Sequence, residues 1–276
     1  MTAKDYKVKP DSRMRTALVT GATSGIGAAV AAALVREGYR VLGTGRNPSA
    51  VATKIAGVEY LALDLGDPAS IEACAAAAGA VDVLVNNAGE SQAGALEELP
   101  MDALRRHFDL NVFGAVRLTQ LVLPGMRERG YGRVVMVGSM MASFPIPFRS
   151  AYSASKAAIR GFATAARGEV SPYGVAVTTV EPGPIKTGIS ARRSETLADG
   201  SPYAAAQATM LRVMDADQKV ATPVDKVART ILRAITAERP KPFYAVGGHA
   251  PVVFALRRML PRIMVERLII RKYRKR

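Results

Sequence analysis

Short apolar runs alternate along the chain with longer stretches whose composition suits helices. The runs predict strands at 16–20, 39–44, 58–63, 81–85, 134–137 and 175–180. The stretches between them predict helices at 28–35, 68–78, 101–128 and 151–172. Because the strands are continuously apolar rather than alternating, both of their faces should be buried. Helices between such strands imply right-handed crossovers in a parallel sheet, so the pattern predicts a doubly wound α/β fold.

One folded domain accounts for most of this pattern. The 276 residues suit a single large α/β domain, and no internal repeat or low-complexity linker divides them. We expect an N-terminal arm at 1–13, the folded domain at 14–250 and a C-terminal tail at 251–276. Pro261 should divide the tail into two short helices.

The net charge of +15 raises the question of a nucleic-acid partner. Residues 1–15 carry five basic and two acidic side chains, and residues 257–276 carry nine basic and one acidic. The remaining 24 basic and 20 acidic residues lie between these ends, which is an ordinary balance for an enzyme surface. The charge is therefore terminal, and we expect no nucleic-acid partner.

The cysteine and histidine content favours neither a disulfide nor a metal site. Cys74 is the one cysteine, so it cannot form an internal disulfide, and it lies in an Ala-rich segment that suits a buried structural position. His107 and His249 are far apart and have no cysteine or carboxylate at ligand spacing. We expect no metal, and a reducing, cytoplasmic location.

A glycine-rich loop follows the first predicted strand and precedes an Ala-rich helix. It has the sequence TGATSGIG over residues 20–27. Glycines permit a tight turn and bring backbone N–H groups close to a pyrophosphate, while the positive end of the helix dipole favours the anion. The loop in this position predicts a nucleotide-binding site.

Tyr152 and Lys156 lie four residues apart in a predicted helix. They therefore share one face, which places the ammonium beside the phenol. A neighbouring cation favours the phenolate form of a tyrosine, and this suits acid/base chemistry. A surface pair at this spacing is also common by chance, so the pair needs the support of other motifs.

Several motifs together resemble the short-chain dehydrogenase/reductase family. The glycine loop matches the family's TGxxxGxG, residues 86–89 match its NNAG, and Tyr152 to Lys156 match its YxxxK, with Ser139 thirteen residues upstream. Pro182, Gly183 and Thr187 match its PG…T segment. The resemblance covers about residues 16–190 and implies a Rossmann-type fold and oxidoreductase activity.

The resemblance implies four catalytic residues. Tyr152 would exchange a proton with the carbonyl or alcohol oxygen while a hydride moves to or from the nicotinamide, and Ser139 would hydrogen-bond that oxygen. Lys156 would also hold the nicotinamide ribose. Asn111, followed by Gly114 in the family's NxxG spacing, would position a proton-relay water; the alternative for Asn111 is an amide on a helix surface.

The resemblance also implies the residues that bind the cofactor. They are Gly21, Thr23, Ser24, Gly25, Ile26, Gly27, Arg46, Asp64, Leu65, Asn87, Ala88, Gly89, Tyr152, Lys156, Pro182, Gly183, Ile185 and Thr187. No carboxylate follows the second strand, where one would bind the ribose of NAD, whereas Arg46 could pair with a 2′-phosphate. We therefore expect NADP rather than NAD. Asp64 and Leu65 resemble the family's adenine-contacting pair, or alternatively belong to a helix N-cap.

The substrate side is unusually apolar. Residues 140–148 (MMASFPIPF) suit a wall for a hydrophobic ligand, and equally core packing under a neighbouring helix. The longer stretch 133–156, with this Met-rich loop and Pro-Phe before Tyr152, is similar to the branch acting on steroids, retinoids and other lipid alcohols or ketones. Residues 185–220 should form a lid over the site. The tail mixes apolar residues with nine basic ones, which suits a peripheral membrane contact, a partner-binding helix or a helix packed on its own domain.

Two functions follow from these motifs. One is an NADPH-dependent reductase of a hydrophobic carbonyl compound, and the other is a noncatalytic nucleotide-sensing or membrane-adaptor protein on the same fold. All four catalytic positions hold the expected residue types, which favours the reductase. The resemblance further implies a homodimer or homotetramer formed through the helices at 101–128 and 151–170.

Overall fold

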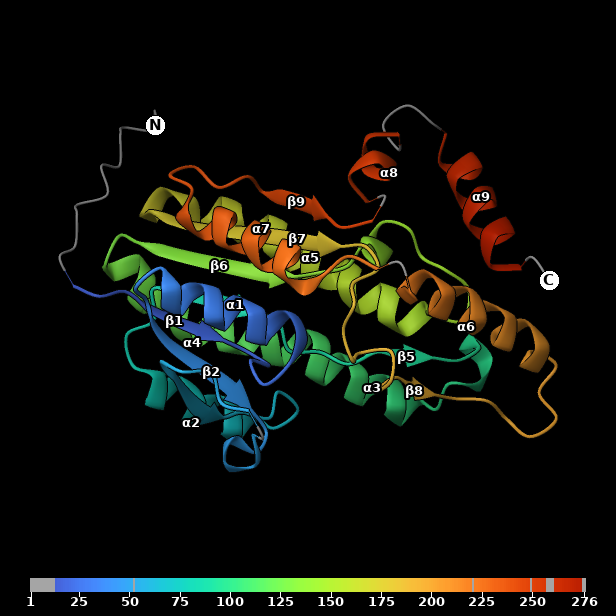
Figure 1. The fold of residues 1–276 in the computed structure, drawn as a ribbon, viewed down its shortest axis with the longest axis horizontal. Helices are drawn as coiled ribbons and strands as arrows, with labels where there is room; N and C mark the ends of the chain where they lie inside the picture. The colour runs from blue at the N-terminus through green and yellow to red at the C-terminus, as the bar shows by residue number, and fades with distance from the viewer. Residues whose placement is uncertain (1–12, 52, 220, 249, 257–260, 275–276) are drawn as a thin grey trace.

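The computed structural model describes residues 13–51, 53–219, 221–248, 250–256 and 261–274 (Figure 1). Most of the expected N-terminal arm lies outside this range. Arg13, its last residue, lies before the first strand and donates two hydrogen bonds to the buried carboxylate of Asp82, at 2.9 and 2.6 Å. The start of the folded domain is therefore tied to the strand that follows Asp82.

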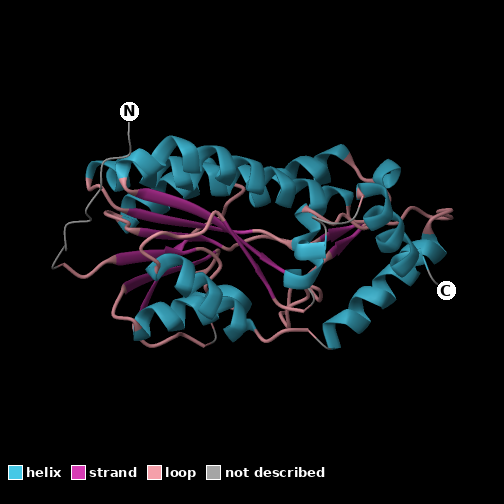
Figure 2. Ribbon diagram, turned by 90° about the horizontal axis from the view of Figure 1, so that it is seen from above, coloured by secondary structure: helices cyan, strands magenta, loops and turns pink. Residues whose placement is uncertain are grey.

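A parallel sheet of seven strands forms the centre of the described chain (Figure 2). Its spatial order is β3-β2-β1-β4-β6-β7-β9, with every neighbouring pair parallel. The strands are β1 (Thr16–Val19), β2 (Arg40–Gly45), β3 (Val58–Ala62), β4 (Val83–Asn86), β6 (Gly132–Val137), β7 (Val175–Pro182) and β9 (Phe243–Val246). The predicted doubly wound fold is confirmed; β9 extends the sheet beyond the strands that the pattern predicted.

Helices cover both faces of the sheet, as Figure 2 shows. α1 (Gly25–Arg36) and α7 (Val224–Thr236) pack on one face, whereas α2 (Pro68–Ala78), α4 (Gly114–Glu128) and α5 (Ser150–Val170) pack on the other. The helix expected at 101–128 is divided: α3 (Met101–Phe108) leads into a π-helical turn at Asp109–Phe113 before α4 begins. Cys74 of α2 is buried in the second of these interfaces, and burial raises the pKa of its thiol to about 11.

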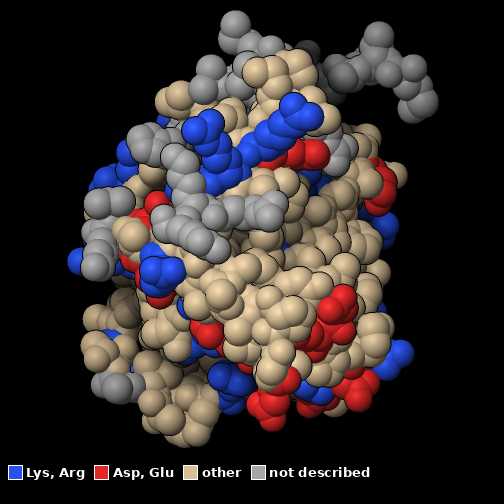
Figure 3. Space-filling view, turned by 90° about the vertical axis from the view of Figure 1, so that its right-hand side faces the viewer, with Lys and Arg blue, Asp and Glu red and all other residues tan. Residues whose placement is uncertain are grey.

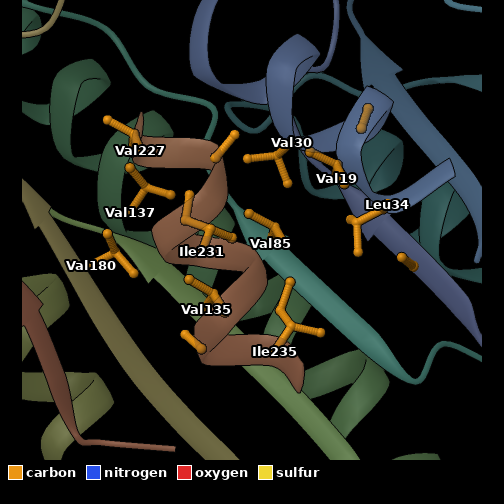
Figure 4. Packing of buried hydrophobic residues seen from close by; sticks show 14 of the residues in the cluster. Val19, Val30, Leu34, Val85, Val135, Val137, Val180, Val227, Ile231 and Ile235 are labelled. Carbon is orange, nitrogen blue, oxygen red and sulfur yellow. The ribbon is translucent and has the colours of Figure 1, made fainter. Parts of the chain in front are cut away.

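α7 illustrates how the core forms. Val227, Ile231 and Ile235 recur every four residues, so they share one face of the helix, and all three are buried. Figure 4 shows this face against Val135 and Val137 of the sheet, beside the side chains of α1. Burial of large aliphatic side chains from both elements fixes α7 and α1 to the same face.

The C-terminal part of the chain builds a second layer beyond the carboxyl ends of the strands. It contains α6 (Ala204–Lys219), α8 (Ala250–Leu256) and α9 (Arg262–Arg274), with the short ribbon of β5 (Gln92–Ala93) and β8 (Ser194–Glu195) nearby (Figure 1). Two helices flank Pro261, as the sequence predicted. Within the described residues, no helix combines the length and apolar character that crossing a bilayer requires.

Candidate active site

A cavity of about 530 Å³ opens at the carboxyl ends of the parallel strands. Loops that follow β4, β6 and β7 supply one side of it, and α5 supplies another. This is the place where doubly wound sheets bind their ligands, because the crossover connections diverge there. Ten of the residues predicted for the site line the cavity: Ile26, Asn87, Gly89, Ser139, Tyr152, Lys156, Pro182, Gly183, Ile185 and Thr187.

The conformation of the glycine loop requires glycine at several positions. Gly21 and Gly25 have φ values of +66° and +57°, a region that favours glycine. A Cβ atom on Gly27 would lie 2.2 Å from the carbonyl oxygen of Gly21, so no side chain fits there. Ser24 caps α1 without a side-chain hydrogen bond, which leaves the first N–H groups of the helix available to an anion.

Thr20 joins the glycine loop to the segment after β4. Its Oγ1 accepts hydrogen bonds from the backbone N–H groups of Asn87 and Ala88, both at 2.9 Å. The side-chain amide of Asn87 in turn donates to the carbonyl oxygen of Thr20 at 2.9 Å. These three bonds set the two loops, 67 residues apart in sequence, in one fixed arrangement.

The end of β2 lies beside the same loop. A Cβ atom on Gly45 would be 2.6 Å from Cγ2 of Thr23, so the strand end and the loop are in close contact. Arg46 follows directly, is exposed, and forms no ion pair or hydrogen bond with a described residue. Its guanidinium is therefore available to a ligand phosphate held at the glycine loop.

Asp64 and Leu65 follow β3 on the same side. The carboxylate of Asp64 accepts a hydrogen bond from the backbone N–H of Gly66 at 2.9 Å, whereas the N-cap of α2 is Asp67. Leu65 is buried against Gly114, where a Cβ atom would lie 2.2 Å from the Leu65 carbonyl oxygen. This contact explains why glycine occupies the last position of the NxxG spacing.

Tyr152, Lys156 and Ser139 line the cavity together, and all three are buried. The ammonium of Lys156 lies 5.8 Å from the centre of the Tyr152 ring and donates to the carbonyl oxygen of Val137 at 3.1 Å. Oγ of Ser139 accepts from the N–H of Met141 at 3.2 Å, which leaves its hydroxyl proton for another acceptor. No described residue forms a hydrogen bond with the Tyr152 hydroxyl.

Asn111 is a buried residue of the π-helical turn, only 2% exposed, rather than a surface amide. Its Oδ1 accepts from the N–H of Glu90 at 2.8 Å, and its Nδ2 donates to the Glu90 carbonyl oxygen at 3.1 Å. A Cβ atom on Gly89 would lie 2.8 Å from Asn111 Oδ1 and 3.5 Å from Lys156 Nζ. The missing side chain therefore allows the amide and the ammonium to approach the same backbone position.

His107 belongs to the same region, although the sequence analysis assigned it no role. It is 1% exposed, and its Nε2 lies 2.9 Å from Nδ2 of Asn111 and 3.4 Å from Oγ of Ser155. Its Nδ1 lies 3.4 Å from a carboxylate oxygen of Glu90. The spacing of four residues from Asn111 was the available signal, because i and i+4 share a helix face.

The far side of the cavity is mostly apolar. The predicted wall contributes Met140, Met141, Phe144 and Ile146. These residues also pack internally: Phe144 lies edge-on to Phe254 of α8, with ring centres 5.0 Å apart, and Ile146 joins a buried cluster with Met210 of α6. The loop therefore packs against neighbouring helices and also lines the cavity.

α9 closes the apolar side of the cavity. It contributes Val265, Leu268, Ile269, Lys272 and Tyr273 to the lining. An ion pair of 2.6 Å between Lys272 and Asp217 attaches it to α6. Burial is the largest of the influences that raise the pKa of the Tyr273 phenol. Within the basic tail, α9 thus packs on the rest of the domain along this face.

A family model described as short chain dehydrogenase matches residues 15–198, which is more than half of the chain. The chain belongs to the short-chain dehydrogenase family. Dehydrogenase/reductase SDR family member 7B of Xenopus tropicalis is 33% identical over 94% of this chain and 86% of that protein. A 3-ketodihydrosphingosine reductase of Bacteroides thetaiotaomicron is 32% identical over 86% of this chain and 90% of that protein.

Solved structures of other short-chain dehydrogenases agree with the fold. One from Streptomyces avermitilis is 35% identical, with a TM-score of 0.80, and the match covers 94% of this chain and 98% of that one. Another, from Sphingobium yanoikuyae in complex with NADPH, is 26% identical with a TM-score of 0.71, over 89% and 91% of the two chains. The predicted family and Rossmann-type nucleotide-binding fold are confirmed, and the protein is an oxidoreductase of this family.

Proposed function

We propose that this short-chain dehydrogenase transfers a hydride between NADP(H) and the carbonyl or alcohol group of a hydrophobic small molecule, with Tyr152 as the acid/base. The observation that carries the proposal is the position of the Tyr152 hydroxyl. It has no described hydrogen-bond partner and lines one cavity with Ser139, Lys156 and an apolar wall. Residues 14–250 form the catalytic domain in this proposal.

The chain fits a nicotinamide dinucleotide. The glycine loop excludes side chains at Gly27, the N-terminus of α1 has available N–H groups, and Pro182, Gly183, Ile185 and Thr187 line the cavity beside it. When bound, the nicotinamide supplies or accepts the hydride at its C4 position. Lys156 would hold the ribose, and Asp64 with Leu65 would contact the adenine.

The remaining chemistry belongs to residues of this chain. In the reductive direction the Tyr152 hydroxyl gives its proton to the carbonyl oxygen, and in the oxidative direction the phenolate accepts it. Ser139 donates a hydrogen bond to the same oxygen. The ammonium of Lys156 stabilises the negative charge left on the phenol, and Asn111 orients a water that returns the proton.

NADP is the proposed cofactor because Arg46, beside the glycine loop, forms no ion pair or hydrogen bond with a described residue, and no carboxylate follows β2 in the sequence. A guanidinium pairs with a 2′-phosphate, whereas a carboxylate at that place would repel it. The Sphingobium yanoikuyae relative in complex with NADPH gives further support.

A lipid-like ketone, aldehyde or alcohol is the proposed substrate class. The apolar lining from residues 140–146, α6 and α9 supports it, and so does the relative named as a 3-ketodihydrosphingosine reductase. Exposed apolar and basic side chains on α9 support reversible contact with a membrane surface, which suits such substrates. A noncatalytic nucleotide sensor or membrane adaptor is the competing function. The presence of the expected residue types at all four catalytic positions, 111, 139, 152 and 156, disfavours it.

The test is NADPH oxidation with a panel of lipid ketones and aldehydes, in the parent chain and in Tyr152→Phe. The variant should lose roughly 10²- to 10⁴-fold in turnover, because acid/base groups typically contribute that much, while NADPH binding stays within about twofold. Tyr173→Phe, an exposed tyrosine just beyond α5, is the matched control. Turnover by Tyr152→Phe within threefold of the parent would reject the assignment.

A further inference from the structure

Arg149 is a buried guanidinium in the wall of the cavity that the proposed mechanism does not use. It is the N-cap residue of α5, one helical turn before Tyr152, and is 2% exposed. Its guanidinium carbon lies 4.5 Å from the centre of the Tyr152 ring, and the residue lines the cavity. A cation therefore stacks on the ring of the tyrosine that is proposed to react.

No described residue accepts a hydrogen bond from the Arg149 side chain. Its Nε and Nη1 are buried without partners, and its other recorded contacts are backbone hydrogen bonds and the stacking on Tyr152. Burial lowers the pKa of Arg149 to about 10, so the group still carries its charge at neutral pH. A buried charge without hydrogen bonds is costly, and such groups usually have a partner.

The nearby carboxylates are engaged with other cations. Glu195 pairs with Arg193 at 3.0 Å, and Asp215 lies 3.8 Å from the same guanidinium. Asp217 pairs with Lys272 of α9 at 2.6 Å. Arg149 senses the positive charge of Arg193 and the opposing negative charge of Glu195, so this ion pair does not neutralise the Arg149 guanidinium, which stays available to an anion.

Apolar residues on this side include Met141 and Ile146 of the loop, Met214 of α6 and Ile269 of α9, whereas the charged lining residues Asp217 and Lys272 pair with each other. One fixed guanidinium among aliphatic side chains matches a ligand with one acidic group and a hydrocarbon chain. Arginine is suited to this role because its planar fork binds both oxygens of a carboxylate.

We propose that Arg149 binds the carboxylate of an acyl-chain substrate, so that the enzyme acts on amphipathic oxo or hydroxy acids. Because Arg149 stacks on the Tyr152 ring, the acid group lies within a few bonds of the reacting carbon. The hydrocarbon chain extends toward α6 and α9. This inference rests on the proposed function for its kinetic part but not for its binding part.

The first experiment measures binding to the NADP-loaded full chain by calorimetry, with dodecanoate, dodecan-1-ol and dodecylamine as probes. The parent chain should bind dodecanoate at least about tenfold more tightly than dodecan-1-ol, and dodecylamine most weakly. Arg149→Met should weaken dodecanoate binding by roughly 10- to 100-fold and leave dodecan-1-ol unchanged, since hydrogen bonds to charged groups are of that strength. Arg149→Lys should retain part of the preference.

Arg105→Met is the matched control, because Arg105 is an exposed arginine with a surface ion pair to Asp102. It should bind all three probes as the parent does. If Arg149→Met does not fold, as a melting curve would show, the three-probe comparison on the parent chain decides alone. Equal binding of dodecanoate and dodecan-1-ol by the parent overturns the proposal.

The second experiment compares the kinetics of 2-, 3- and 4-oxododecanoate with those of their methyl esters. Arg149→Met should raise KM for the preferred acid at least about tenfold and leave KM for its ester unchanged. A fall in kcat by the same factor for acid and ester would mean that Arg149 acts only through Tyr152, which overturns the proposal. If no carbonyl compound is turned over, the proposed function fails, and the binding data still decide whether Arg149 holds a carboxylate.

Discussion

Gly27 shows how much one position contributes to the nucleotide site. A Cβ atom there would lie 2.2 Å from the Gly21 carbonyl oxygen and 2.6 Å from the side-chain nitrogen of Asn87. The missing side chain therefore lets the loop close on itself while Asn87 holds it to the neighbouring strand. Arg46 and Arg149 contribute through the side chains they carry. No described residue accepts a hydrogen bond from either guanidinium, so both charges are available to a ligand.

Arg46→Ala should weaken NADP binding about tenfold or more and change NAD binding little. A charge-assisted contact to a phosphate contributes roughly 1.5–3 kcal/mol, and NAD lacks that phosphate. Calorimetry with both cofactors measures the difference. The control is Arg36→Ala, which changes an exposed arginine at the C-terminal end of α1, away from the glycine loop. It should change neither affinity. Equal losses for the two cofactors would mean that Arg46 does not recognise the 2′-phosphate.

Among the helices, α9 has one face packed on the domain and one face exposed. One face packs on α6 and the cavity through Ile269 and Tyr273. The other presents the exposed side chains Ile263, Met264 and Ile270. Figure 3 looks at this end of the molecule and shows basic side chains, with acidic ones beside them, above a broad uncharged surface. An apolar and basic outer face is typical of helices that lie on anionic membranes.

The full chain should therefore pellet with anionic vesicles at low salt and less so at high salt. Basic residues near an acidic surface contribute about 1 kcal/mol each, and this attraction is screened within roughly 8 Å at physiological salt. Arg267→Glu with Arg271→Glu, two exposed positions of α9, should reduce cosedimentation at least tenfold.

The paired control reverses two exposed charges outside α9 and outside the helices expected to mediate assembly. Arg36→Glu with Arg229→Glu, in α1 and α7, should pellet as the parent does. If the parent chain ignores anionic vesicles at low salt, the outer face of α9 is better explained as a contact between subunits.

At the scale of the whole molecule, the site lies where three layers meet. The parallel sheet brings its loops to one edge, the flanking helices position Tyr152 and Lys156, and α6 with α9 closes the cavity from outside (Figure 1). Two large aromatic side chains remain on the surface of the central helices: Phe113 of the π-helical turn is 54% exposed, and Phe162 of α5 is 46% exposed. Exposed aromatics on the helices expected to mediate assembly support a subunit interface.

The protein should form a homodimer or homotetramer, and Phe162→Glu should shift it toward a smaller species. A charge placed in an apolar interface is left without a partner when the interface closes. Light scattering coupled to size exclusion measures the mass of each variant. Leu197→Glu, at an exposed apolar position outside these helices, should leave the mass unchanged. A monomeric parent chain would contradict the expectation.

Local sequence patterns were sufficient to predict six strands of the sheet, the glycine loop and the family. These features depend on local patterns: continuous apolar strands, glycines where no Cβ fits, and short motifs such as NNAG and YxxxK within single segments. Nine of the helices and strands described match predicted segments for this reason, apart from the interruption of the helix at 101–128 by a π-helical turn. The division of the tail at Pro261 is local in the same way, because proline interrupts a helix wherever it lies.

Side-chain partnerships between distant segments could be seen only in the folded structure. Asn111 is buried because Glu90, 21 residues away, satisfies both groups of its amide, and α9 closes the cavity because Lys272 reaches Asp217 across 55 residues. The isolation of Arg149 likewise depends on Glu195 and Asp215 binding Arg193 instead. Such partnerships depend on how elements pack, and side-chain periodicity within one segment carries no information about which carboxylate a distant arginine will meet.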